Sequence, residues 1–182
     1  MNMIIVYASK TGVTEDVAME MAKKLGEDCA LYDCRNQLLT HDQHGVQPNF
    51  SDLTDYDLVI LGTAMYMGRP IKEMTRFLAE HEAALSMVPL AFFTCGMGTA
   101  REDSGYLLKT LPASLREKNP AYFHMGGEIR ENRLNPLERL AMRLAMKTVK
   151  NAPQVDHDAI STASETLITI AKAKREASAC NA

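Results

Sequence analysis

The sequence lacks several features that mark common functional classes. No apolar run approaches the ~20 residues that a membrane-spanning helix requires, and no secretory signal precedes the first apolar segment. The four cysteines form no Cys-x-x-Cys pair and have no histidine at metal-ligand spacing, which argues against a metal site and favours reduced thiols. The net charge of −3 argues against nucleic-acid binding. We therefore expect a cytoplasmic protein without a bound metal, in which any membrane contact is peripheral.

Common nucleotide-binding motifs are also absent. No Gly-x-x-x-x-Gly-Lys-Ser/Thr pattern occurs, and the segment Gly96–Gly98 is followed by Arg101 where a dinucleotide fingerprint requires a third glycine. A receiver domain needs acidic residues at the ends of its first and third strands. Here the corresponding apolar runs end in small or hydroxyl-bearing residues. These three classes are therefore excluded.

The first apolar run, Met3–Ala8, is followed by a segment rich in hydroxyl groups. The run is short and rich in β-branched residues, as in a buried parallel strand, and the residues after it have helical spacing. A strand-to-helix turn points backbone N–H groups and the positive end of the helix dipole outward, which suits a phosphate. The residues alone leave two interpretations open: a phosphate-binding loop, or an N-cap and turn without a ligand. The candidate phosphate loop contains Ser9, Lys10, Thr11, Gly12, Val13 and Thr14.

Apolar periodicity along the chain alternates between strands and helices. This order predicts an α/β fold: a doubly wound five-stranded parallel sheet in the order 2-1-3-4-5, with helices on both faces, forming a single domain over 1–182. The segment 35–55 lacks clear periodicity and predicts a long irregular connection. Beyond the first strand, we expect strands near 29–32, 58–62, 88–94 and 121–125, and helices over about 14–25, after Pro70, around Leu107 and over about 158–174.

Two further loops are expected beside the phosphate loop, because ligands of such sheets bind at the carboxyl ends of the strands. In one of them Tyr66 stands among small and sulfur-containing residues, which predicts a stacking surface for a flat ring, and Gly68 allows close backbone approach. Alternatively, Tyr66 packs on the following helix, and the glycines of the other loop form only a turn. The candidate ring contacts are Thr63, Ala64, Met65, Tyr66, Met67, Gly68, Thr94, Cys95, Gly96, Met97 and Gly98.

The pattern Ser-x-Thr-Gly-x-Thr directly after an N-terminal strand resembles the FMN-phosphate loop of the flavodoxins. The resemblance runs along most of the chain and implies a flavodoxin-like fold that binds FMN and transfers electrons to or from a redox partner protein or a quinone. It also implies that the phosphate loop and the two ring loops hold the cofactor.

A more specific resemblance rests on the loop Ala64–Gly68, the missing second helix and the extension after the fifth strand. Together these features resemble the menaquinone-dependent protoporphyrinogen oxidases, in which FMN accepts electrons from a porphyrinogen and passes them to a quinone or respiratory partner at the membrane. That family carries a long basic insertion after the fourth strand, whereas Arg101–Gly105 is short and mixed in charge. The oxidase activity is therefore the alternative to a general electron-transfer role.

A helical extension at about 128–151 separates the last strand from the last helix. Apolar residues recur on one face at helical spacing, and Arg139, Arg143 and Lys147 recur every four residues on another, which predicts a basic amphipathic helix over 136–150. With Arg130 and Arg133 nearby, this helix is either a surface for anionic lipid, an acidic redox partner or porphyrin carboxylates, or a solvated face over an ordinary core contact.

Overall fold

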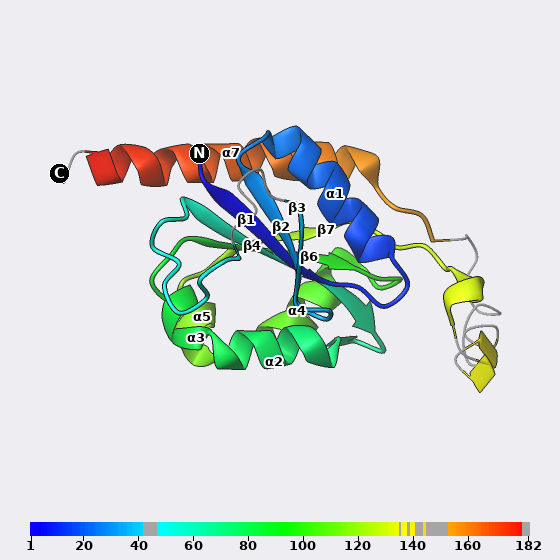
Figure 1. Ribbon diagram of the computed structural model, residues 1–182. Helices are drawn as coiled ribbons and strands as arrows, with labels where there is room; N and C mark the ends of the chain where they lie inside the picture. The colour runs from blue at the N-terminus through cyan, green and yellow to red at the C-terminus, as the bar shows by residue number, and fades with distance from the viewer. Residues whose placement is uncertain (42–46, 135, 138, 141–143, 145–152, 180–182) are drawn as a thin grey trace.

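The computed structural model describes residues 1–41, 47–134, 136–137, 139–140, 144 and 153–179. The centre of the protein is a mostly parallel sheet with helices on both sides (Figure 1). When the five parallel strands are numbered by their order in the sequence, they lie side by side in the sheet as 2-1-3-4-5. The predicted fold class is therefore confirmed. In spatial order, these strands are β2 (Cys29–Asp33), β1 (Met3–Ala8), β4 (Leu58–Tyr66), β6 (Leu90–Cys95) and β7 (Ala121–His124).

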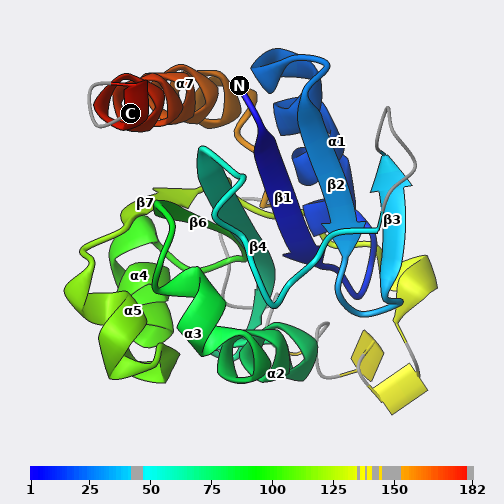
Figure 2. The same cartoon turned by 60° about the vertical axis from the view of Figure 1, so that its left-hand side comes forward.

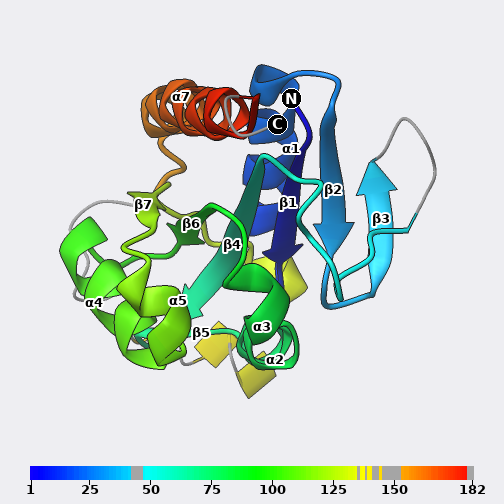
Figure 3. The same ribbon diagram turned by 90° about the vertical axis from the view of Figure 1, so that its left-hand side faces the viewer.

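Two helical layers bury the two faces of the sheet (Figures 1 and 3). Alternate residues of each strand point to opposite faces, so Ile5 and Ile60 belong to one apolar cluster while Ile4 and Val59 belong to the other. The first cluster includes α1 (Val13–Leu25) and α7 (His157–Ala179), and the second includes α2 (Lys72–Glu80), α3 (Glu82–Leu85), α4 (Ala100–Thr110) and α5 (Ala113–Glu117).

The connection after β2 is more regular than the sequence predicts. Strand β3 (Leu38–His41) pairs antiparallel with β2 at the edge of the sheet (Figure 2). The expectation of an irregular segment over 35–55 is therefore wrong for β3. Gln37 lies in the turn between β2 and β3 with a positive φ of 53°. Glutamine rarely adopts this conformation, so the residue type gives no sign of a turn. Residues 42–46 lie outside the described residues.

The chain after β7 returns across the carboxyl end of the sheet. Gly126 forms an antiparallel bridge with Val155, and a 3₁₀ turn, η1 (Glu131–Arg133), follows. Most of the predicted basic helix over 136–150, including Arg143 and Lys147, lies outside the described residues and stays a prediction. In the described part of the chain, none of the helices combines the length and apolar character needed to cross a membrane.

Candidate functional site

A cavity of about 420 Å³ lies at the carboxyl ends of β1, β4 and β6. This is the edge where the strand order reverses and where the sequence predicts a ligand. The sheet brings the phosphate loop and both ring loops to this one cavity. The predicted residues that line it are Lys10, Thr11, Val13, Thr14, Ala64, Met65, Tyr66, Met67, Cys95, Gly96 and Met97.

The phosphate loop leaves the first turn of α1 without a side-chain cap. Gly12 is the N-cap residue with a φ of 91°, and among the described residues no side chain caps the N–H groups of the first turn. The Ser9 hydroxyl instead accepts a hydrogen bond from the Gly12 N–H at 3.0 Å, and the Arg35 guanidinium donates to the Ser9 carbonyl at 3.1 Å. These contacts shape the loop but do not satisfy the helix terminus. The structure therefore does not show the capping that the ligand-free interpretation requires.

Thr14 supplies a second unsatisfied group at the same place. Its side chain is fully buried, and Oγ1 has no nitrogen or oxygen partner among the described residues. Its polar neighbour is the thiol of Cys95, a weak hydrogen-bonding group. A buried hydroxyl without a good partner costs about 1–3 kcal/mol, so a ligand that forms a hydrogen bond with it recovers part of this free energy on binding.

The hydroxyl side chains of Thr63 and Thr94 do not line the cavity. Both are buried in the strands, where Thr63 Oγ1 donates to the Ala64 carbonyl at 3.2 Å and Thr94 Oγ1 lies 2.5 Å from Tyr122 Oη. Their hydroxyls are therefore directed to partners within the protein.

Gly68 and Gly98 also pack against other residues of the protein instead of lining the cavity. A Cβ atom at Gly68 would lie 2.9 Å from the ring of Tyr106, and one at Gly98 would lie 2.5 Å from Asp103 Oδ1. Both neighbours belong to α4, so the packing of this helix accounts for both glycines.

Tyr66 stands at the boundary of two cavities. It ends β4, and the turn after it reverses the chain into β5 (Arg69–Pro70) through Met67 and Gly68, both with positive φ. Tyr66 is partly exposed, and Lys10 Nζ lies 5.5 Å from its ring centroid. Both residues also line a second cavity of about 390 Å³. The Tyr66 ring is therefore partly open to the cavity, with Lys10 over one of its faces.

The wall of the cavity near β6 contains no reactive thiolate. The pKa of the Cys95 thiol is raised to about 12, mainly by burial; the contact with Thr14 opposes this rise and the charge of nearby Asp103 adds to it. The Asp103 carboxylate is buried near His124, with 3.2 Å between its Oδ2 and His124 Nδ1, and this oxygen has no hydrogen-bond partner among the described residues. Among the described residues there is also no group of three or more His, Cys, Asp or Glu side chains that could hold a metal ion.

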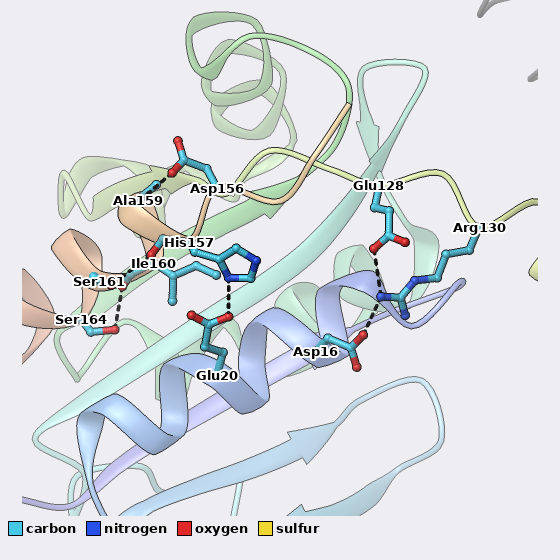
Figure 4. A network of polar contacts seen from close by, with 10 residues as sticks. All are labelled: Asp16, Glu20, Glu128, Arg130, Asp156, His157, Ala159, Ile160, Ser161 and Ser164. Carbon is cyan, nitrogen blue, oxygen red and sulfur yellow. Dashed lines mark hydrogen bonds and ion pairs between the residues drawn. The ribbon is translucent and has the colours of Figure 1, made fainter. Parts of the chain in front are cut away.

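The segment after β7 closes one side of the cavity, which the sequence does not predict. Arg130 Nη2 donates to Asp16 Oδ2 at 2.6 Å and to Glu128 Oε2 at 3.1 Å (Figure 4). The first bond joins residues 114 positions apart, so no local pattern reveals it. The cavity residues that the sequence reasoning missed are Gly127, Glu128, Ile129, Arg130 and Leu134.

The sheet order and the cavity at its carboxyl edge define a flavodoxin-like α/β protein. The chain belongs to the flavodoxin domain family, whose model matches residues 4–156. No curated protein matches the sequence.

Solved structures with the same fold are distant in sequence. The chain is similar to a flavodoxin, WrbA-like protein from Agrobacterium tumefaciens, at 16% identity and a TM-score of 0.57, over 96% of this chain and 98% of that one. It is similar to a flavodoxin from the domain Archaea at 11% identity and a TM-score of 0.52, over 96% and 99%. Rubredoxin oxygen:oxidoreductase from Desulfovibrio gigas matches at 17% identity and a TM-score of 0.58, over 95% of this chain and 36% of that chain. At these identities the likeness shows the fold alone.

Proposed function

We propose that this protein binds FMN in the cavity at the carboxyl edge and uses it for electron transfer. The observation that carries the proposal is the N-terminus of α1, which has no side-chain cap and holds the buried Thr14 hydroxyl against the cavity. Helix N-termini of this kind bind phosphate groups through their N–H groups and dipole. Membership of the flavodoxin domain family favours a flavin as the group that carries the phosphate.

The residues present fit both ends of FMN. Thr11, Thr14 and the first turn of α1 hold the phosphate, Tyr66 stacks on the ring, and Cys95–Met97 line the opposite side. When bound, FMN supplies reversible uptake and release of electrons. The protein orients the cofactor and excludes water from the buried side of the ring.

The exposed rim of the cavity favours electron exchange with a second molecule. Met67 is fully exposed and Met97 is 44% exposed, and both line the cavity. Exposed apolar side chains next to a cofactor site favour close approach of a partner. We therefore propose a redox partner protein or a quinone as the electron partner.

The first experiment is a titration of the protein with FMN, FAD and riboflavin, followed by flavin fluorescence. We expect tight binding of FMN and weaker binding of the other two. Thr11→Ala should weaken FMN about tenfold, because one hydrogen bond contributes about 1 kcal/mol net. Tyr66→Ala should weaken FMN and riboflavin alike. Equal affinity of the wild-type protein for FMN and riboflavin would contradict the phosphate assignment, and failure to bind any flavin would overturn the proposal.

A protoporphyrinogen oxidase-like activity, the alternative that the sequence raises, gains no support from the comparisons. The basic helix predicted over 136–150 lies mostly outside the described residues, and Arg139 donates to the carbonyl of Glu131 at 3.1 Å. The assay that tests this alternative supplies protoporphyrinogen and a menaquinone analogue to the FMN-loaded protein, and a general electron-transfer role predicts no turnover. Steady turnover would place the oxidase first.

A further inference from the structure

Arg130 lies against the phosphate loop although it comes from the segment after β7. We propose that Arg130 is an additional phosphate ligand of this site, held ready by Asp16 and Glu128. The proposal rests on the function proposed above and adds a second cation to a loop whose own charged residue is Lys10. It identifies the preferred ligand as a phosphate monoester rather than an uncharged flavin.

The guanidinium of Arg130 is positioned between α1 and Gly12. Its Nη2 atom donates to both carboxylates, at 2.6 Å to Asp16 and 3.1 Å to Glu128. Its Nη1 atom lies 3.0 Å from the position that a Cβ atom at Gly12 would occupy. Among the described residues Nη1 has no hydrogen-bond acceptor, so one side of the fork is available to a ligand at the loop.

The negative charge around the loop favours a cation beside the ligand. The first turn of α1 carries Glu15 and Asp16, and Glu128 lines the same cavity. A phosphate monoester brings a charge of about −1.5 to −2 at neutral pH, which these carboxylates repel. Arg130 offsets part of the negative charge of Asp16 and Glu128 and offers planar donors that match phosphate oxygens.

The backbone before Arg130 is held by close contacts with the ring loop. The N–H of Gly96 donates to the Gly126 carbonyl at 2.8 Å, and a Cβ atom at Gly127 would lie 2.6 Å from the Gly96 carbonyl oxygen. Gly126 has a φ of 65° and pairs with Val155. The position of Arg130 is therefore coupled to the loop that lines the other end of the cavity.

A second cross-link to α1 supplies a matched control. Glu20 lies one helical turn after Asp16, and its Oε2 atom is 2.8 Å from His157 Nδ1 (Figure 4). This pair also joins the C-terminal part of the chain to α1, yet neither residue lines the cavity. Removing it tests the effect of losing a cross-link without losing a ligand.

The test compares affinities for FMN and riboflavin in the wild-type protein, Arg130→Gln and Glu20→Gln. Arg130→Gln should weaken FMN about 10- to 100-fold, as expected for a charge-assisted hydrogen bond, and leave riboflavin unchanged. It should also reduce the dependence of FMN affinity on salt concentration. Glu20→Gln should change neither affinity. Unchanged FMN binding in Arg130→Gln, or equal loss of FMN and riboflavin, would overturn the proposal.

A titration with inorganic phosphate separates this proposal from the flavin assignment. We expect phosphate to raise the thermal midpoint of the wild-type protein but not that of Arg130→Gln. Stabilisation of both proteins to the same extent would contradict a role for Arg130. If the wild-type protein binds phosphate through Arg130 but no flavin, the flavin assignment fails while the anion ligand stands.

A double-mutant cycle tests whether Asp16 positions Arg130 for the ligand. Asp16→Asn removes a repulsive charge but also removes a carboxylate that holds the guanidinium, so FMN affinity should change little in the wild-type background. In the Arg130→Gln background only the repulsion is relieved, so FMN affinity should rise by a larger factor. Equal changes in both backgrounds would show that the two residues act independently and would contradict the positioning role of Asp16.

Discussion

Helices α1 and α4 both begin at the carboxyl edge of the sheet, yet their N-termini are satisfied in different ways. At α4 the Thr99 hydroxyl accepts from the Glu102 N–H at 3.3 Å, and the Glu102 carboxylate accepts from the Thr99 N–H at 3.0 Å. This is a complete capping box. At α1 the N-cap residue is Gly12, and no side chain in the described part of the chain caps the helix.

The difference shows which loop the chain completes by itself. A glycine N-cap costs about a few tenths of a kcal/mol of stability relative to a Ser, Thr, Asn or Asp cap, and it leaves the first-turn N–H groups without a side-chain acceptor. At α4 the chain avoids that cost with its own side chains. At α1 it leaves the donors of the first turn and the Thr14 hydroxyl beside a cavity, which is the arrangement expected where a ligand completes the structure.

The largest effect is expected from a methyl group at the uncapped terminus. Gly12 has a φ of 91°, so Gly12→Ala introduces about 1–2 kcal/mol of backbone strain. Its Cβ atom would lie 3.0 Å from Arg130 Nη1, so the guanidinium must shift. We expect FMN affinity to fall roughly 30- to 100-fold, about 2–2.7 kcal/mol. Isothermal titration with FMN measures this loss.

Gly26, just after the other end of α1, is the control for backbone strain. It has a φ of 103°, and a Cβ atom there would meet nothing within 4 Å. Gly26→Ala should therefore lower the thermal midpoint without changing FMN affinity. Comparable loss of FMN affinity in both variants would mean that strain, and not contact with the loop, causes the effect.

Exchanging one threonine at each helix start should separate ligand binding from stability. Thr14→Val removes a buried hydroxyl that has no nitrogen or oxygen partner, so the ligand-free protein should keep or gain stability while FMN binds about tenfold more weakly. Thr99→Val removes the capping hydroxyl, so stability should fall by about 1 kcal/mol with FMN affinity unchanged. Urea unfolding and FMN titration of both variants provide the comparison. If both variants lose only stability, or both lose only FMN affinity, the proposed difference between the N-termini of α1 and α4 is wrong.

The fold and the three loops could be predicted because their signals are local. Short apolar strands alternate with amphipathic helices, and this order alone implies the sheet and the edge where ligands bind. Within the predicted loops, the sequence does not distinguish residues that face the cavity from those that face the protein. Gly68 and Gly98 are explained by Tyr106 and Asp103 of α4, which only the folded chain brings near them.

Long-range contacts set the limit of that reasoning. Arg130 reaches the phosphate loop from beyond β7, three strands away from β1 in the sheet. No spacing rule connects residues so distant in sequence. Strand β3 was missed for a different reason, because Gln37 adopts a positive φ that its residue type rarely takes.

The smallest expected effect is a pH dependence at the capped helix. Hydrogen bonds from the Thr99 N–H and hydroxyl lower the pKa of Glu102 below its ordinary value of 4.5. A carboxyl whose pKa is lower in the folded state adds stability above the unfolded value, and loses that contribution as pH falls through the folded value.

Glu102→Gln keeps a side-chain acceptor without the charge. The variant should therefore be slightly less stable than the wild-type protein above pH 4.5, and the gap should close in more acidic solution. Thermal midpoints from pH 3 to pH 7 in roughly half-unit steps measure this change. Glu15→Gln is the matched control, because Glu15 occupies the same third position of α1 where no capping box forms. A gap that persists unchanged at the lowest pH would show that Glu102 acts by packing and not through its charge.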